Sequence, residues 1–525
     1  MDRITEIARR RTFAIVSHPD AGKTTLTEKL LLFGGAIQTA GAVKSNKIKR
    51  AATSDFMEIE KQRGISVATS VMGFEYAGLK INILDTPGHQ DFVEDTFRTL
   101  TVVDSVIVVV DSAKGVEQQT EKLMAVCRER KTPVIIFVNK LDRDGLEPFD
   151  ILDELEAKLS ITLSPLSWPL GMGRAFRGVW NLYEKRFCLF SPHGTQEEED
   201  TVVVRDPHDP LLRQRFGDLA DTLSQDLKMI EGVFPAFVRE RWLAGDIAPV
   251  FFGSAINNFG VRELLDCFAQ IAPPPGPVIS MERSVSPQEE KFSGFVFKIH
   301  ANMDPRHRDR IAFLRIVSGT FVRNEPYYHV RLDRNVRFSS PHAFFAEKKA
   351  IVEEAFPGDI IGLPDTINFK LGDTLSAGEK LNYRGVPSFS PEHFRYVENA
   401  DPMRSKQLDK GLNELLDEGV AQIFTSLTSG RRIIATVGVL QLEVLQYRLE
   451  HEYNAKCRYQ HIDMHKACWV SSDDPAVLAG FRRKRESACS LDRNGRLVFL
   501  APSSWAIKLA QDDFPEITFH YSSEF

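Results

Sequence analysis

A short loop near the start of the chain has the residue types of a phosphate-binding site. It follows the apolar run Thr12 to Val16 and leads into a helical pattern. In a P-loop, backbone N–H groups wrap the phosphates, a lysine reaches the β and γ phosphates, and a Ser or Thr hydroxyl binds Mg²⁺. Serine replaces the first glycine of the general motif. An ordinary turn between a strand and a helix could also contain these residues. The predicted phosphate-binding residues are Ser17, His18, Pro19, Asp20, Ala21, Gly22, Lys23, Thr24 and Thr25.

Two more polar segments follow apolar runs, at the points where strands of a parallel sheet would end. The first follows Lys80 to Leu84 and offers a carboxylate for Mg²⁺ and a glycine N–H for the γ-phosphate. The second follows Pro133 to Val138, at the carboxyl edge where ligands bind. One such segment alone is more often an exposed turn, but three in this order predict a nucleotide site. The two segments are Asp85, Thr86, Pro87 and Gly88, and Asn139, Lys140, Leu141 and Asp142.

The second segment also predicts which base is bound. The carboxylate of Asp142 can accept hydrogen bonds from guanine N1–H and the 2-amino group, and adenine offers neither in that arrangement. GTP and GDP are therefore the expected nucleotides. After the run Val250 to Phe252, the backbone N–H groups of Gly253, Ser254 and Ala255 are predicted to contact the guanine oxygen.

Two single residues could complete a hydrolytic site. Ser66, in the stretch Arg63 to Ser66, stands where GTPases carry a switch hydroxyl that binds the metal, although it could simply begin a strand. His89 directly follows Gly88, from where it could orient the water that attacks the γ-phosphate, and a satisfied surface histidine is the alternative. The predicted Mg²⁺ ligands are thus Thr24, Ser66 and Asp85, and His89 is the catalytic candidate.

The elements that would position these residues form an α/β domain. Apolar runs alternate with helical patterns, as in a parallel sheet covered by helices on both faces. Two of the runs lack polar alternation, as expected for strands buried on both faces. The predicted strands are Thr12 to Val16, Ser66 to Tyr76, Lys80 to Leu84, Ser105 to Val110, Pro133 to Val138 and Val250 to Phe252, and helices are expected at Glu117 to Arg130 and Val261 to Ile271.

The length of 525 residues predicts about three domains. We expect a P-loop GTPase domain over residues 1–272, with an inserted subdomain at about 160–245. The prolines at 273–277 suit a stiff linker. Short β-like runs then predict a small β-barrel over 280–387, and mixed patterns predict an α+β domain over 391–525. The sequence shows no internal repeat.

Composition limits the possible partners. Hydrophobic residues (43%) and charged residues (26%) are near the average for folded proteins, which excludes global disorder. The net charge of −6 excludes a polycation that coats nucleic acid, so any RNA contact must be local. No apolar run is long enough for a bilayer span or a signal-peptide core. The six scattered cysteines suit reduced thiols, so we expect a cytoplasmic protein.

Two basic runs could meet RNA phosphates, although such runs more often mark solvated faces. His461 and His465 would share a helix face, but neither a following Glu nor a third ligand is nearby, which argues against a metal site. The basic residues are Lys44, Lys47, Lys49 and Arg50 in the first run, and Arg482, Arg483, Lys484 and Arg485 in the second.

The chain resembles the translational GTPases in the three nucleotide segments, in Arg63 to Ser66 and in His89. It is most similar to the bacterial class II release factors, the family of peptide chain release factor three. This closer resemblance rests on Ser17 to Thr25, on Glu60 to Ser66, on Ala301 to Pro305 with His307 to Arg310, and on Val437 to Gln441. It covers essentially the whole chain and is weakest over 471–525.

The resemblance implies a monomeric, ribosome-stimulated GTPase that helps to remove a class-one release factor after peptide release. GTP binding and hydrolysis would govern its entry and departure, without a covalent intermediate. In similar GTPases the histidine after the Asp-Thr-Pro-Gly segment acts only when ribosomal RNA positions it, so His89 would be silent off the ribosome. The barrel and the last domain would face the ribosome, and neither DNA nor a membrane is an expected partner.

Two alternatives stay open. A translocase or ribosome-protection GTPase resembling elongation factor G would use the same nucleotide site, although that family has additional C-terminal domains in a longer chain. A non-catalytic, GTP-dependent ribosome-binding module would use the nucleotide only as a switch.

Overall fold

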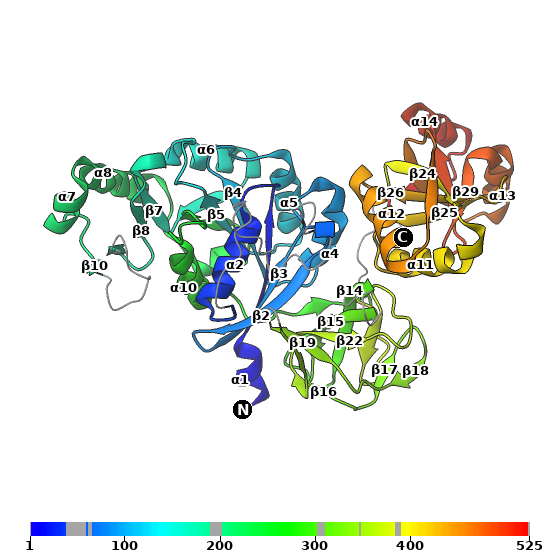
Figure 1. The fold of residues 1–525 in the computed structure, drawn as a ribbon, viewed down its shortest axis with the longest axis horizontal. Coiled ribbons are helices and arrows are strands. Elements are labelled where there is room, and N and C mark those ends of the chain that lie inside the picture. Colours follow the sequence, from blue (N-terminus) through cyan, green and yellow to red (C-terminus); the bar gives the residue numbers. More distant parts are fainter. Residues whose placement is uncertain are drawn as a thin grey trace.

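The structure is a computed structural model that describes residues 2–37, 59–60, 66–189, 202–301, 310–345, 348–383 and 390–522. Three units follow one another along the chain (Figure 1). A large α/β unit occupies the left and centre of the view, a β unit lies below it, and an α+β unit lies at the right. No helix among the described residues is long and apolar enough to cross a bilayer.

The first unit is built on a seven-stranded sheet in the order β2-β3-β1-β4-β5-β11-β6. All neighbouring strands are parallel except β2 and β3, which are antiparallel. The predicted α/β domain is therefore confirmed. The strands are β1 (Arg10–Ser17), β2 (Ser70–Tyr76), β3 (Leu79–Asp85), β4 (Ser105–Asp111), β5 (Val134–Asn139), β6 (Thr162–Pro165) and β11 (Ile247–Phe252).

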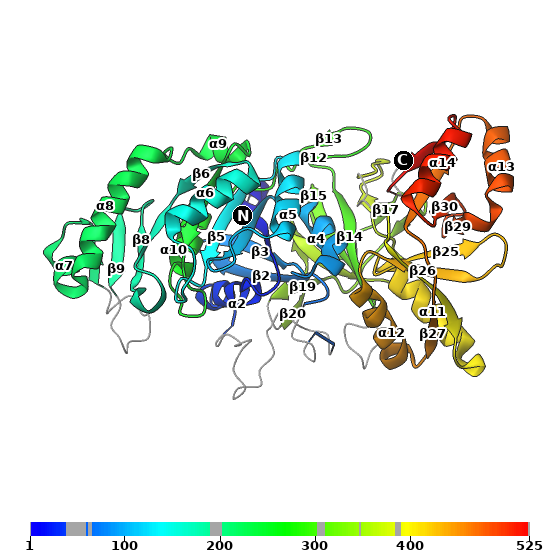
Figure 2. The same ribbon diagram turned by 90° about the horizontal axis from the view of Figure 1, so that it is seen from above.

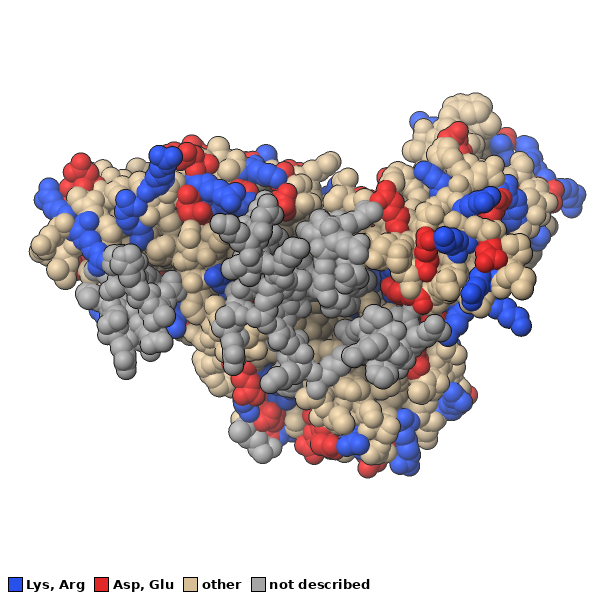
Figure 3. Space-filling view, viewed as in Figure 1, with Lys and Arg blue, Asp and Glu red and all other residues tan. Residues whose placement is uncertain are grey.

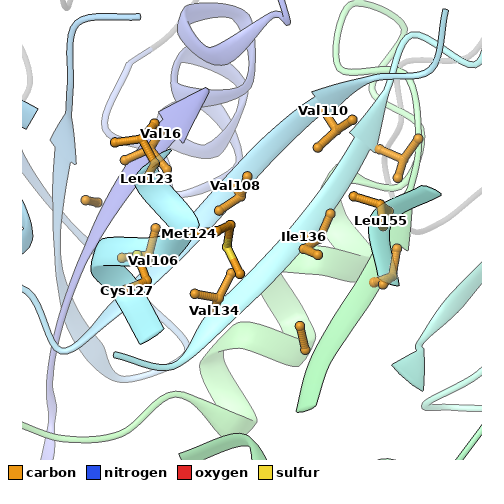
Figure 4. Packing of buried hydrophobic residues seen from close by; sticks show 14 of the residues in the cluster. Val16, Val106, Val108, Val110, Leu123, Met124, Cys127, Val134, Ile136 and Leu155 are labelled. Carbon is orange, nitrogen blue, oxygen red and sulfur yellow. The ribbon is translucent and has the colours of Figure 1, made fainter. Parts of the chain in front are cut away.

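Helices lie on both faces of this sheet, which explains the lack of polar alternation in its central strands. Val106, Val108 and Val110 of β4 pack in one buried cluster with Met124 and other apolar side chains (Figure 4). Ile107 and Val109 enter a second cluster on the opposite face. The helices are α1 (Arg3–Ala8), α2 (Lys23–Phe33), α4 (Val93–Leu100), α5 (Gln118–Glu129), α6 (Pro148–Leu159) and α10 (Val261–Ile271), with the short 3₁₀ helix η1 (Gln90–Phe92) before α4.

The packing around Val108 predicts a measurable loss of stability when its side chain is shortened. Val108 has no exposed surface. Val108→Ala removes buried methyl groups and leaves a cavity, so the free energy of unfolding should fall by about 2 kcal/mol in urea denaturation. The matched control is Val233→Ala, at a valine that is 67% exposed, which should change it by less than about 0.5 kcal/mol. Equal losses in the two variants would contradict the packing described.

An additional group of elements lies between β6 and β11, at the left of Figure 1. It contains an antiparallel sheet in the order β10-β9-β8-β7. Strand β6 falls within the insertion expected at about 160–245, but it pairs with β11 in the main sheet. The additional elements are β7 (Ser167–Leu170), β8 (Gly178–Asn181), β9 (Arg186–Leu189), β10 (Val202–Val204), the 3₁₀ helix η2 (Gly173–Ala175), α7 (Pro210–Phe216), α8 (Asp218–Val233) and α9 (Arg239–Leu243).

The second unit is a curled antiparallel sheet in the order β18-β17-β23-β14-β15-β22-β19-β20, a half-barrel. Val296, Leu314 and Leu375 lie in its buried core. The strands are β14 (Ser293–Ala301), β15 (Arg310–Ser318), β17 (Tyr327–His329), β18 (Arg334–Val336), β19 (His342–Phe345), β20 (Lys348–Ile351), β22 (Ile360–Pro364) and β23 (Thr374–Ser376), and two small strand pairs join β12 (Val278–Ile279) to β13 (Ser284–Val285) and β16 (Phe321–Val322) to β21 (Glu354–Ala355).

The third unit has one eight-stranded sheet in the order β27-β24-β26-β25-β29-β30-β28-β31. Its first half runs β24 (His393–Asn399), α11 (Ser405–Asp417), β25 (Gln422–Ser426), β26 (Arg432–Thr436), α12 (Val439–Tyr453) and β27 (Cys457–His461). The second half runs β28 (Lys466–Ser471), α13 (Pro475–Lys484), β29 (Cys489–Asp492), β30 (Leu497–Ala501), α14 (Ser504–Asp513) and β31 (Thr518–His520). Short 3₁₀ helices precede α11 (Pro402–Arg404) and β29 (Glu486–Ala488). The predicted α+β architecture is confirmed.

Each half of this unit has the chain order β-α-β-β-α-β of the split βαβ motif. Numbered within its half, the first set of strands lies in the order 4-1-3-2 and the second in the order 2-3-1-4. The two halves meet where β25 pairs with β29. In Figure 2, α11 and α12 lie toward one end of the unit and α13 and α14 toward the other. The third unit thus contains a structural repeat that the sequence did not predict.

The histidine pair and the cysteines can also be compared with what the sequence predicts for them. His461 ends β27 and His465 precedes β28, so the two histidines do not share a helix face. His461 Nε2 instead lies 2.7 Å from Asp463 Oδ1.

Cys127 and Cys267 are buried, and burial raises the pKa of both thiols to about 12. Such thiols are protonated at neutral pH and are not nucleophiles. The domain boundaries stay predictions, since the one near residue 387 lies outside the described residues.

Candidate nucleotide-binding site

The loop between β1 and α2 has the backbone conformation of a phosphate cradle. Asp20 (φ 65°) and Gly22 (φ 97°) both adopt left-handed conformations. A Cβ at Gly22 would lie 2.2 Å from Asn139 Nδ2, so only glycine fits there. The loop ends at the N-terminus of α2, whose unpaired N–H groups and partial positive charge favour an anion.

Lys23 and Asp85 form a buried ion pair inside this loop. Lys23 Nζ lies 2.5 Å from Asp85 Oδ1, and the two residues are 5% and 1% exposed. The other carboxylate oxygen, Asp85 Oδ2, is buried and has no hydrogen-bond partner among the residues that the structure describes. A buried acceptor without a partner is costly unless a ligand or water satisfies it. An unsatisfied carboxylate oxygen is the kind of donor that Mg²⁺ prefers, so Asp85 fits its predicted role, while the roles of Thr24 and Ser66 as metal ligands stay predictions.

The segment after Asp85 is fixed against the P-loop. Thr86 Oγ1 donates a hydrogen bond to Ile15 O at 2.9 Å, and Thr96 Oγ1 donates one to Pro87 O at 3.2 Å. A Cβ at Gly88 would come within 3.5 Å of Pro19 Cα. The segment therefore places Gly88 beside the loop predicted to hold the phosphates.

Asn139 ties the third segment to the P-loop. Its Nδ2 donates to Ala21 O at 2.9 Å, and its Oδ1 accepts from Ala255 N at 2.9 Å. Lys140, in a left-handed conformation (φ 71°), lies 2.6 Å from Asp111 Oδ2 through Nζ. These bonds join the Asn139 segment and Ala255 to the P-loop, and the bond from Thr86 to Ile15 adds the Asp85 segment at the same end of the sheet, at the carboxyl ends of its parallel strands.

Asp142, the predicted base-reading residue, is oriented by Ser254. Ser254 Oγ donates to Asp142 Oδ1 at 2.6 Å and accepts from Asn257 Nδ2 at 3.0 Å. From the sequence, only the backbone N–H of Ser254 was predicted to take part in the site. The presence of a serine hydroxyl at position 254 could have indicated that its side chain binds the carboxylate of Asp142.

The three backbone amides predicted for the guanine oxygen already have partners in this structure. Gly253 N donates to Val138 O at 2.9 Å, Ser254 N to Phe259 O at 3.0 Å, and Ala255 N to Asn139 Oδ1. The predicted contact with guanine therefore requires one of these N–H groups to be shared or released.

The Ser254 hydroxyl provides a test of how Asp142 is held. Ser254→Ala removes one hydrogen bond, worth about 0.5 to 1.5 kcal/mol, so GTP affinity should fall by roughly 2- to 13-fold. The preference for GTP over XTP should persist, because the carboxylate remains. Titration with a fluorescent GTP analogue measures the change, and Ser504→Ala, at an exposed serine of α14, is the matched control. An unchanged affinity would show that Ser254 does not orient the carboxylate.

His89 lies next to the P-loop and is partly exposed. Its Nδ1 accepts a hydrogen bond from Asp91 N at 3.2 Å, and its side chain is 32% exposed. His18 in the P-loop lies 2.9 Å from Glu117. Burial lowers the pKa of His18, Glu117 opposes this, and the charges of Lys114 and His89 lower the pKa further.

The stretch from Ser66 to Thr69 is held by side chains ahead of β2. Val67 N and Ala68 N donate to Glu60 Oε1 at 2.8 and 3.2 Å. Thr69 N donates to Asp95 Oδ2 at 2.5 Å. Because β2 begins only at Ser70, the prediction of a strand from Ser66 is wrong at that end. Residues 63–65 lie outside the described residues.

The basic run on α13 is only partly available to a partner. Arg482 and Arg483 are exposed, whereas Lys484 Nζ and Arg485 Nη2 lie 3.1 and 2.5 Å from Asp513 Oδ2. Blue side chains gather over α13 at the outer right of Figure 3. RNA contact by this run stays a prediction. The first basic run, residues 44–50, lies outside the described residues.

Comparison with known proteins agrees with this architecture. Residues 8–274 match the elongation factor Tu GTP binding domain, and residues 291–378 match elongation factor G domain 2. Residues 383–511 match the C-terminal domain of the class II release factor RF3. A crystal structure of a protein from Thermus thermophilus shares the fold with a TM-score of 0.69 at 22% identity, covering 89% of this chain and 71% of that chain.

The first match spans just over half of the 525 residues and contains every nucleotide segment described above. Such a domain binds guanine nucleotides, and translational GTPases work on the ribosome. The chain therefore belongs to the translational GTPases with an elongation factor Tu GTP binding domain, and it carries the C-terminal domain of a class II release factor.

Proposed function

We propose that this protein is a ribosome-stimulated GTPase of translation termination that promotes the removal of class-one release factors after peptide release. The observation that carries the proposal is the joining, in one chain, of the nucleotide site to the class II release factor C-terminal domain. The three proposed domains are residues 1–272, 280–387 and 391–525. The protein would act as a monomer in the cytoplasm, where it meets ribosomes.

The P-loop residues are assigned to the phosphates of the nucleotide. The N–H groups at the start of α2 would bind phosphate oxygens, and Lys23 would leave Asp85 to contact the β and γ phosphates. Thr24, Ser66 and Asp85 would hold Mg²⁺, which when bound neutralises charge on the phosphate oxygens. Asp142, held by Ser254, would read guanine.

His89 is assigned to the reacting water. Phosphoryl transfer depends largely on positioning and electrostatics, so a side chain that orients the attacking water has a large effect on the rate. Water attacks the γ-phosphorus and GDP departs, without a covalent intermediate. Because His89 is partly exposed beside the P-loop, ribosomal RNA could fix its orientation.

The deciding experiment follows a fluorescently labelled class-one release factor on a post-release ribosome. The protein is added with GTP, with a non-hydrolysable analogue, or with GDP. We expect faster dissociation that requires a triphosphate, and comparison of GTP with the analogue shows whether hydrolysis is needed. No acceleration, despite ribosome-stimulated hydrolysis in the same samples, would refute the termination role.

The match of residues 291–378 to elongation factor G domain 2 favours a translocase or ribosome-protection GTPase as the second candidate. That function would produce ribosome-stimulated hydrolysis without release-factor departure. A non-catalytic binding module would differ again, since it would release no phosphate in a single turnover on the ribosome.

A further inference from the structure

Asp91 connects the segment containing His89 to the C-terminal unit. It lies two residues after His89, in η1, and is 8% exposed. Its Oδ2 accepts a hydrogen bond from Leu440 N at 2.7 Å, across 349 positions of the sequence. Its other oxygen, Oδ1, lies 3.3 Å from His89 Nδ1. One carboxylate therefore faces the catalytic candidate and the C-terminal unit together.

The donor to Asp91 is one of the N–H groups that a helix cannot satisfy by itself. Leu440 is the second residue of α12, and the first four N–H groups of a helix have no partner within it. The Gln441 side chain accepts from Val437 N and Gly438 N. Asp91 satisfies the N–H group of Leu440 and places a negative charge at the positive end of the helix.

Gly438 permits this close approach. A Cβ at this position would lie 2.0 Å from Asp91 Cγ and 2.3 Å from Asp91 Cβ. The backbone of Gly438 (φ −128°, ψ 160°) is extended, a conformation that any residue adopts. The absence of a side chain matters here for space and not for backbone freedom.

Apolar packing surrounds the polar contact. Phe92, next to Asp91, is buried in a small cluster with Ile59, Val67 and Val444. Leu440 and Tyr447 of α12 pack against the same cluster. Arg98 of α4 donates to Glu418 O at 3.1 Å and to Gly419 O at 3.0 Å in the C-terminal unit. The stretch before β2, the His89 segment and α12 therefore share one interface.

We propose that Asp91 is a positioning residue that couples the orientation of His89 to the placement of the C-terminal unit. While α12 stays in contact with the His89 segment, the hydrogen bond from Leu440 N–H holds Asp91 Oδ2 in place. The rotation of the carboxylate is then fixed, and Oδ1 stays directed toward His89. If α12 moves away, the carboxylate turns freely and the imidazole loses a fixed neighbour. The inference rests on the proposed role of His89 in hydrolysis.

Two variants test the coupling from opposite sides of the interface. Asp91→Ala removes the carboxylate, and Gly438→Ala pushes α12 away from it without altering the nucleotide-binding unit. Each should lower ribosome-stimulated kcat by about 10- to 100-fold with little change in KM for GTP, because a small misplacement of a catalytic group has an effect of this size. The double variant should be no slower than the slower single variant, since both break one contact.

The controls separate positioning from general damage. Asp91→Asn keeps an acceptor oxygen for Leu440 and should retain activity within about threefold of the original. Gly480→Ala, in the same unit, adds a Cβ that meets only Phe514 at 3.9 Å, and it should change neither kcat nor nucleotide binding.

Hydrogen exchange gives a readout that does not depend on activity. The amide of Leu440 should exchange slowly in the original protein and fast in Asp91→Ala and Gly438→Ala, while Gly480→Ala leaves it slow. Fast exchange with unchanged kcat would overturn the coupling and leave the proposed function standing. Slow exchange in Asp91→Ala would overturn the contact itself. If His89→Ala also kept full turnover, both the catalytic assignment of His89 and the coupling would fail. If GTP hydrolysis were normal but the class-one release factor did not leave the ribosome, only the termination role would be refuted.

Discussion

His89→Ala should lower the ribosome-stimulated rate of GTP hydrolysis by about 10²- to 10⁴-fold, the usual contribution of a positioned acid–base or water-orienting side chain. The affinity for GTP should change little, because the imidazole of His89 is held by Asp91 N and not by any P-loop residue described here. The loss should therefore appear in kcat and not in KM.

Phosphate release on post-release ribosomes measures this effect under single-turnover and multiple-turnover conditions. His461→Ala is the matched control, since that side chain is 62% exposed at the end of β27, in the C-terminal unit. A change within about threefold for His89→Ala, well under 1 kcal/mol of transition-state stabilisation, would remove His89 from the catalytic role.

Asp142→Asn should convert the nucleotide preference from guanine toward xanthine. The carboxylate accepts from the 2-amino group of guanine, whereas an amide N–H₂ donates to the 2-oxo group of xanthine. Ser254 Oγ donates to Asp142 Oδ1, so the oxygen of the new amide can keep that bond and direct its N–H₂ toward the base. The ratio of GTP to XTP affinity should change by about 10³-fold or more, as for other sites that leave a buried polar group unpaired with the wrong ligand.

Competition between GTP and XTP against a fluorescent guanine nucleotide measures this ratio directly. Asp144→Asn, two residues further along the same loop, is the matched control and should leave the ratio unchanged. An unaltered ratio in Asp142→Asn would exclude Asp142 from base recognition, whatever happens to the absolute affinities.

The parts of the fold that follow from local patterns could be predicted from the sequence. The run Val106 to Val110 has no polar alternation because β4 is buried on both faces, and the helix Val261–Ile271 has the predicted bounds. The strand from Ser66 was predicted too long. There, the N–H groups of Val67 and Thr69 are bound by the side chains of Glu60 and Asp95 and not by a neighbouring strand.

Features that depend on distant contacts could not be predicted. The repeat in the C-terminal unit was not recognised in the sequence, because each half needs only apolar residues at corresponding positions and not the same residues. The contact between Asp91 and Leu440 joins positions 349 apart, and no local spacing indicates it. The sequence shows that residue 254 has a hydroxyl, but it does not show that this hydroxyl points toward Asp142. That direction depends on how the ends of the strands are arranged in the sheet.

The pairing of β25 with β29 has a consequence for how the C-terminal unit can be divided. Each of these strands would be the outer strand of its own half, with a row of unpaired N–H and C=O groups open to any other strand. By covering each other, the two strands protect both halves from edge-to-edge aggregation. Neither half is therefore a suitable fragment for expression by itself, and the two halves should fold and unfold as a single cooperative body.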